Sequence, residues 1–133
     1  MSEDETPASD QPETGEPKMR TLRDDQISVA TLKRMAQGMF GNIVKAVVDV
    51  DLGIMVVDME MHADAEALLI DNGSRQRALW GINLHPESFG SAEFVEFDSM
   101  INMRPRQGNN SKYVEDAGER AKVLAIVERL VKQ

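Results

Sequence analysis

The chain has 133 residues, of which 29% are charged and 41% hydrophobic, and its 23 acidic and 15 basic residues give a formal net charge of −8. This length predicts one small domain that buries roughly two thirds of its unfolded surface in a single core. The sequence has no cysteine, which excludes disulfides, thiolate metal sites and cysteine nucleophiles.

The hydrophobic residues do not form a membrane span. The longest apolar run lies within Ile43 to Val50 and is already broken by Lys45 and Asp49, whereas a span needs about 18 apolar residues or more. The N-terminus lacks the basic and apolar segments of a signal peptide. We therefore expect a cytoplasmic protein without a membrane partner.

The acidity is concentrated at the N-terminus. Residues 1–17 contain six acidic residues and three of the five prolines, but no Lys or Arg. Because such a segment cannot bury enough apolar surface to offset its ordering entropy, we predict a disordered acidic tail at 1–18 and a single domain at 19–133. Removing these six acids from the total of 23 leaves 17 acids against 15 bases. A nearly neutral domain without a patch of basic and aromatic residues argues against nucleic acid as a partner.

Two segments have the 3.6-residue period of amphipathic helices. In the first, Leu32, Ala36 and their apolar neighbours face one side, Ser28 is expected to cap the start, and Gly41 to end the helix. The second begins at Asp116, which has capping-box spacing to Glu119, and extends to the C-terminal region. Its expected apolar stripe comprises Ala117, Ala121, Leu124, Val127, Leu130 and Val131.

Between the helices the period changes to two, which is typical of strands. Residues 43–50 and 54–62 predict a hairpin with a turn at 51–53, and 79–85 and 94–103 predict two more strands. Residues 64–72 favour a short helix capped by Asp64 and closed by Gly73, although Asn72-Gly73 is also a hairpin signal. Residues 104–112 have the composition of a loop.

The order α-β-β-(α)-β-β-α predicts an α+β fold. We expect an antiparallel four-stranded sheet with the N- and C-terminal helices packed on one face. The opposite face would then display a polar row that contains both histidines. This row comprises Asp58, Glu60, His62, Asn83, His85, Glu96, Asp98 and Asn102.

Four residues of this region form a candidate metal site. Glu60, His62, Asp64 and His85 offer the carboxylate and imidazole ligands that suit Mn, Fe or Zn, and a divalent metal there would activate water for hydrolysis. A solvated or dimerising sheet face explains the same alternation, and the sequence has no HExxH motif. A site for a divalent metal cofactor is therefore one interpretation of these residues, and a solvated or dimerising sheet face is the other.

The end of one predicted strand and the loop after the next form a candidate anion site. Its residues are Asn83, Arg104, Arg106, Asn109, Asn110 and Ser111. The two arginines can hold a phosphate or carboxylate through paired hydrogen bonds, and Gly108 would let the backbone approach closely. A polar connecting loop is the alternative interpretation.

Several short strings of the chain form a recognisable set. They are KAVVD at 45–49, HADAE at 62–66, GSRQ at 73–76, LWGIN at 79–83, and SMIN, RP and GN within 99–109. From about Met19 to the C-terminus, the chain resembles a family of short prokaryotic proteins of similar length whose function is unassigned. The resemblance implies a compact domain without the tail, and it brings no catalytic roles.

These patterns favour a binding or protein-interaction module that takes a small molecule or an anion. Self-association through the exposed sheet face or an edge is expected, because uncovered sheet edges invite pairing. The alternative is a metal-assisted hydrolase or a phosphate-ligand enzyme that uses the histidines and carboxylates of the sheet face.

Overall fold

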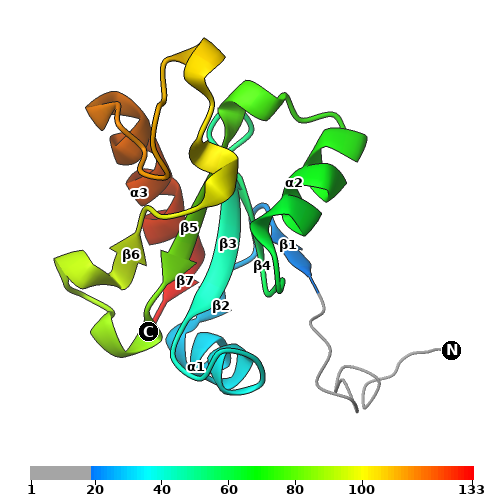
Figure 1. Ribbon diagram of the computed structural model, residues 1–133. Helices are drawn as coiled ribbons and strands as arrows, with labels where there is room; N and C mark the ends of the chain where they lie inside the picture. Colours follow the sequence, from blue (N-terminus) through cyan, green and yellow to red (C-terminus); the bar gives the residue numbers. More distant parts are fainter. Residues whose placement is uncertain (1–18) are drawn as a thin grey trace, which may run out of the picture.

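The computed structural model describes residues 19–133, and the predicted tail at 1–18 lies outside this range. A five-stranded antiparallel sheet of order β1-β4-β3-β5-β6 forms the centre of the described domain (Figure 1). The strands are β1 (Arg20–Leu22), β3 (Val44–Asp49), β4 (Ile54–Val57), β5 (Leu79–Leu84) and β6 (Val95–Glu96). The α-helices are α1 (Val29–Gln37), α2 (His62–Asp71) and α3 (Ala117–Leu130).

The α+β class is confirmed, but the sheet has five strands where four were predicted. The additional strand is β1, which pairs with β4. Its three residues are too few to show an alternating pattern in the sequence.

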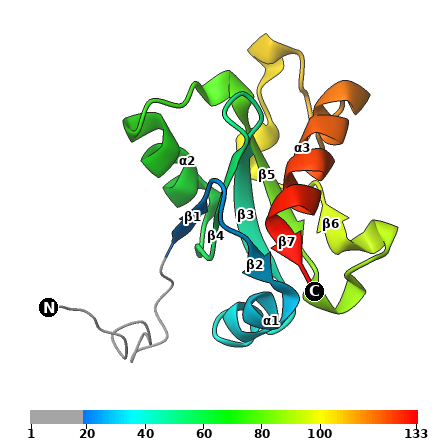
Figure 2. The same cartoon turned by 180° about the vertical axis from the view of Figure 1, so that it is seen from behind.

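Helices cover both faces of the sheet. Leu32 of α1 and Val127 of α3 share one buried core with Ile82 of β5, so the prediction that these two helices pack on the same face is confirmed. Helix α2 packs on the other face, through Ala65 and Leu69. Figures 1 and 2 show α2 on one side of the strands and α3 on the other. The prediction of an open second face is therefore wrong where α2 lies.

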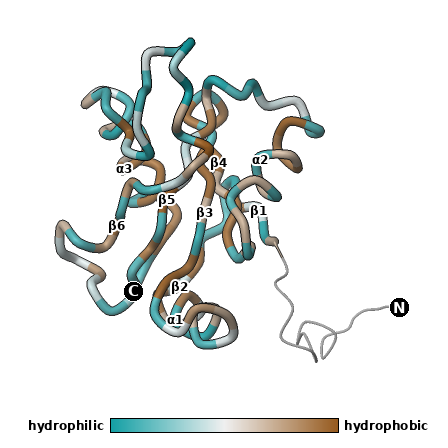
Figure 3. Tube along the Cα trace, in the orientation of Figure 1, coloured by the Kyte–Doolittle hydropathy of each residue, from teal (hydrophilic) through white to brown (hydrophobic). Residues whose placement is uncertain are grey.

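The alternation in the central strands separates two apolar cores. All residues of β4 and β5 are buried, and the strands form the most hydrophobic part of the tube in Figure 3. Val47 faces the α2 side while its neighbours Ala46 and Val48 face the α1 and α3 side. No helix within residues 19–133 combines the length and the apolar character required to cross a membrane.

The cap signals at two helix starts are confirmed. Ser28 Oγ accepts the backbone N–H of Thr31 at 3.1 Å, and the Asp116 carboxylate accepts that of Glu119 at 2.9 Å. Helix α1 ends at Gln37, before the predicted Gly41. Gly41 still has the predicted left-handed conformation, with φ of +91°, and its N–H donates to the carbonyl of Ala36 at 2.6 Å.

The apolar stripe of α3 is displaced from the predicted one. Its buried residues are Val123, Ile126, Val127 and Leu130, and Leu124 is 45% exposed.

The helical interpretation of 64–72 is confirmed, with different ends. Helix α2 starts at His62, and its N-cap position is Met61, which makes no side-chain cap bond. Capping by Asp64 is therefore wrong. Gly73 follows the helix with φ of +105°, the left-handed conformation that favours glycine after a helix end.

The predicted strand at 94–103 is wrong for most of its length. Only β6 pairs with β5, and a 3-10 turn follows at Met100–Asn102. Beyond β6 the Asn102 side chain takes the place of a neighbouring strand. Its Oδ1 accepts the N–H of Gly81 at 2.8 Å, and its Nδ2 donates to the carbonyl of Gly81 at 3.0 Å. Asn102 is completely buried.

A second, parallel pair of short strands joins segments from the two ends of the described domain. β2 (Ile27–Ser28) pairs with β7 (Val131–Lys132), which directly follows α3. Arg129 reinforces this closure, because its guanidinium donates to the carbonyls of Arg23 and Gly53.

Candidate functional site

The predicted metal ligands around α2, Glu60, His62 and Asp64, lie in different environments. His62 is 8% exposed, and its Nε2 lies 2.8 Å from the carbonyl oxygen of Ile82, which accepts a hydrogen bond from the ring N–H. Burial lowers the pKa of His62 below its usual 6.5, although the bond to Ile82 acts in the opposite sense. Glu60 and Asp64 are exposed. His62 is thus a neutral side chain that attaches the start of α2 to the sheet.

His85 and Asn83 come together at the far end of β5, around Glu96 of β6. His85 Nε2 lies 2.9 Å from Glu96 Oε1, and Asn83 Nδ2 donates to the same oxygen at 3.3 Å. The hydrogen bond from His85 is the main cause that lowers the pKa of Glu96 from 4.5. Between Met19 and Gln133 no three His, Asp or Glu side chains gather in an arrangement that could hold a metal ion.

Three residues of the predicted anion site shape the loop that carries them. Asn109 is buried, donates to three loop carbonyls at 2.6–3.0 Å, and accepts the N–H of Glu115 at 2.9 Å. The backbone of Asn110 and the hydroxyl of Ser111 donate to the Glu115 carboxylate. These groups satisfy one another within the loop.

The two arginines of the predicted anion site also differ. The Arg104 guanidinium lies 4.3 Å from the centre of the Trp80 ring, and its Nη1 donates to the carbonyl of Ile101. Its Nε and Nη2 are buried without a hydrogen-bond partner in the described chain. Burial lowers the pKa of Arg104 below its usual range. Arg106 is exposed.

A polar hollow beside Trp80 was missed by the sequence reasoning. Its volume is about 390 Å³. It is lined by Val50, Asp51, Arg75, Arg77, Ala78, Gln107, Glu119 and Lys122. We call it the basic hollow, because three of these side chains are cationic and two are acidic.

A buried aspartate positions one wall of the basic hollow. Asp49 closes β3, and its Oδ1 accepts the backbone N–H groups of Asp51 and Leu52 at 2.8 and 3.0 Å. Its Oδ2 accepts the hydroxyl of Ser74 at 2.6 Å. The turn after β3 is thereby fixed against the segment that continues into Arg75.

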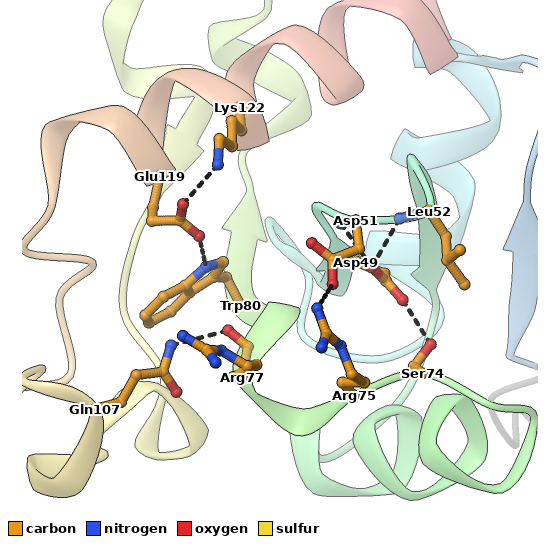
Figure 4. Close-up of polar contacts among 10 residues, drawn as sticks. All are labelled: Asp49, Asp51, Leu52, Ser74, Arg75, Arg77, Trp80, Gln107, Glu119 and Lys122. Carbon is orange, nitrogen blue, oxygen red and sulfur yellow. Dashed lines mark hydrogen bonds and ion pairs between the residues drawn. The ribbon is translucent and has the colours of Figure 1, made fainter.

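Two of the three cations are held by carboxylates. Arg75 Nη2 donates to Asp51 Oδ2 at 3.0 Å, and Lys122 Nζ donates to Glu119 Oε2 at 3.0 Å (Figure 4). The hydrogen bond to Glu119 is the main cause that raises the pKa of Lys122. The other oxygen of Glu119 accepts the indole N–H of Trp80 at 2.9 Å. Both cationic side chains remain largely exposed, at 71% for Arg75 and 60% for Lys122.

Arg77 is the third cation, and its guanidinium makes no ion pair or hydrogen bond with the described residues. Gln107 Nε2 donates to its backbone carbonyl at 2.8 Å. In the view of Figure 4, Trp80 lies between Arg77 with Gln107 and Glu119 with Lys122. Four segments far apart in the sequence build this hollow, so no local spacing connects its residues.

The comparisons with known proteins give a family and no function. A family model described as "Protein of unknown function (DUF5674)" matches residues 21–130. No curated protein matches the chain, and no solved structure matches it either. The matched region contains all of α1, α2 and α3. The predicted resemblance to a family of unassigned function is confirmed, and the chain belongs to this DUF5674 family.

Proposed function

We propose that the protein is a small binding module whose ligand is an anion held in the basic hollow. The carrying observation is Arg77, a guanidinium that lines the hollow without a carboxylate partner among the described residues. A guanidinium presents a planar fork of N–H donors that matches the oxygens of a phosphate or carboxylate. The neighbouring Arg75 and Lys122 add positive charge at the same place.

The ion pairs of Arg75 and Lys122 support this role. Asp51 and Glu119 hold the two cations beside the hollow at 3.0 Å each, and both cationic side chains stay accessible to a ligand. The hollow also contains no histidine and no hydroxyl side chain, so its lining offers no imidazole base and no serine-type nucleophile.

The enzyme alternative requires the histidines to act on an anion held by Arg104 and Arg106. His85 follows the end of β5, whereas the Arg104 guanidinium lies over Trp80 near its start, and the five extended steps from Trp80 to His85 separate their backbone positions by about 17 Å. His62 is occupied by the Ile82 carbonyl. The geometry therefore favours binding over hydrolysis.

Calorimetric titration of the full chain with inorganic phosphate and with acetate at low salt tests the proposal. Saturable binding of at least one anion is expected, and Arg77→Gln is expected to weaken it by about tenfold or more. Arg106→Gln removes the same charge from an exposed arginine outside the hollow, so it is expected to change the affinity by less than about twofold. Equal losses in both variants, or no saturable binding of either anion, would refute an anion site in the hollow.

Self-association is the other predicted role. Helix α2 covers part of the sheet face through which pairing was expected, and the edge strands β1 and β6 have only three and two residues. Short edges offer few unpaired backbone groups to a partner. Light scattering on the same sample, with and without phosphate, measures whether the chain dimerises.

A further inference from the structure

We infer that the ligand of the basic hollow is a phosphorylated polyol, a small phosphate monoester whose other atoms are rich in hydroxyl groups. This inference rests on the proposed function and names the class of ligand. It assigns the cationic side chains to the phosphate and the acceptor groups of the walls to the hydroxyls.

The size of the hollow exceeds what an isolated anion needs. Its volume of about 390 Å³ lies near the lower end of the range of about 300–1,000 Å³ for small-molecule sites. A bare phosphate would leave part of this space to water. A compact substituent on the phosphate would fill it.

The lining determines the chemistry of that substituent. Only Val50 and Ala78 are apolar among the eight lining residues, so an acyl or aromatic tail would find little surface to contact. Asp51 and Glu119 bring carboxylate oxygens, and Gln107 Oε1 accepts no hydrogen bond from the described residues. A hydroxyl group both donates and accepts, so it can bond to a carboxylate and to a guanidinium within one site. A second acid group on the ligand would instead be repelled by the two carboxylates.

The position of Trp80 argues against a nucleotide. A protein that recognises a nucleobase without hydrogen bonds to the edge of the base depends on stacking the base against an accessible aromatic ring. Trp80 is 2% exposed, Arg104 lies over its ring at 4.3 Å, and its N–H is bonded to Glu119. The indole is therefore part of the wall and offers no stacking surface.

Calorimetric titration of the full chain with four probes tests the ligand class. The probes are inorganic phosphate, ribose 5-phosphate, free ribose and adenosine monophosphate. Ribose 5-phosphate is expected to bind about tenfold tighter than inorganic phosphate or better, because hydroxyl contacts add to the same charge contacts. Free ribose is expected to bind at least tenfold more weakly than ribose 5-phosphate, and adenosine monophosphate no tighter than it.

A matched pair of acid variants sharpens the test. Asp51→Asn removes a wall carboxylate without touching the backbone bonds of the turn, which end on Asp49. It is expected to abolish the advantage of ribose 5-phosphate over inorganic phosphate. The readout is the ratio of the two affinities, because the loss of the Arg75 partner acts on both probes alike. Asp64→Asn removes the same charge from an exposed position on α2 and is expected to leave both affinities within about twofold.

The outcomes distinguish the assignment of a phosphorylated polyol from the proposal of an anion site. If inorganic phosphate binds and requires Arg77 but ribose 5-phosphate binds no tighter, the polyol assignment is overturned and the anion site stands. Adenosine monophosphate binding more than tenfold tighter than ribose 5-phosphate would also overturn it, in favour of a base-recognising site. If no phosphate-containing probe binds, or if free ribose binds as well as its phosphate, both the polyol assignment and the anion site fall.

Discussion

Replacing Asn102 by Ala is expected to destabilise the fold by about 3–5 kcal/mol. The side chain is completely buried, and its amide makes two hydrogen bonds to Gly81 and one to the carbonyl of Lys112 at 2.8 Å. A net bond contributes roughly 0.5–1.5 kcal/mol, and a buried backbone group left unpaired costs about 1–3 kcal/mol. Since a small domain is stable by about 5–15 kcal/mol, this loss is a large share of the total.

Two further variants separate the hydrogen bonds from the volume of the side chain. Asn102→Asp keeps the size and the acceptor for the Gly81 N–H, but it has no N–H for the two carbonyls, so it is expected to be at least as destabilising at neutral pH. Asn110→Ala is the control, because this exposed side chain makes no hydrogen bond with the described residues. It is expected to change stability by less than about 0.5 kcal/mol.

Urea unfolding measures these differences through the fluorescence of Trp80, the one tryptophan of the sequence. The ring is 2% exposed in the fold, so its emission is expected to change when the core opens. If the slope of the free energy of unfolding against urea concentration is unchanged and both Asn102 variants lose less than about 1 kcal/mol of this free energy, the view that this amide replaces a strand is refuted.

Three other predictions concern stability. Gly81→Ala places a Cβ 2.6 Å from the Ser99 side chain, so urea unfolding is expected to show that the free energy of unfolding falls by about 1–3 kcal/mol. Ser99→Gly in the same chain is expected to restore part of this loss. If the losses of the two single variants add up in the double variant, the clash is contradicted. The pKa of His62 is lowered in the fold, so the unfolded chain takes up the proton at a higher pH than the folded chain does. The free energy of unfolding is therefore expected to fall as the pH drops below about 6.5, by at most about 1.4 kcal/mol per pH unit. His62→Gln should remove this part of the pH dependence in urea titrations at several pH values, and an unaltered slope would disprove its origin. Asp116→Ala removes the cap acceptor of α3 and is expected to lower the free energy of unfolding by about 1 kcal/mol, with Asp71→Ala, outside any cap bond, as the comparison.

Sequence patterns correctly predicted those elements that are stabilised by contacts between residues close together in the chain. Ser28 and Asp116 were identified as caps because a cap bond joins residues three positions apart. The hairpin of β3 and β4 was predicted from alternation and from the turn at 51–53, which ends at Gly53 with φ of +70°. The second face of the sheet was misjudged, because Val47 and Val56 face a second core and a single alternating pattern does not reveal it.

The candidate site could not be predicted in the same way. Arg77 and Gln107 lie in two 3-10 turns and Lys122 lies in α3, and their spacing in the chain carries no period. Arg104, by contrast, was selected for its charge, yet its guanidinium lies against Trp80. Sequence patterns indicated residues able to bind an anion, whereas only the fold determines which of them share a concave surface.

The pairing of β2 with β7 has a consequence for the order in which the protein is made. Residues 27 and 28 are synthesised about a hundred residues before their partners, residues 131 and 132. Ser28, the cap of α1, lies within this pair. The start of α1 therefore gains its full support only after residue 132 has been synthesised, so the closing contacts of the domain form after translation of this segment and not during it.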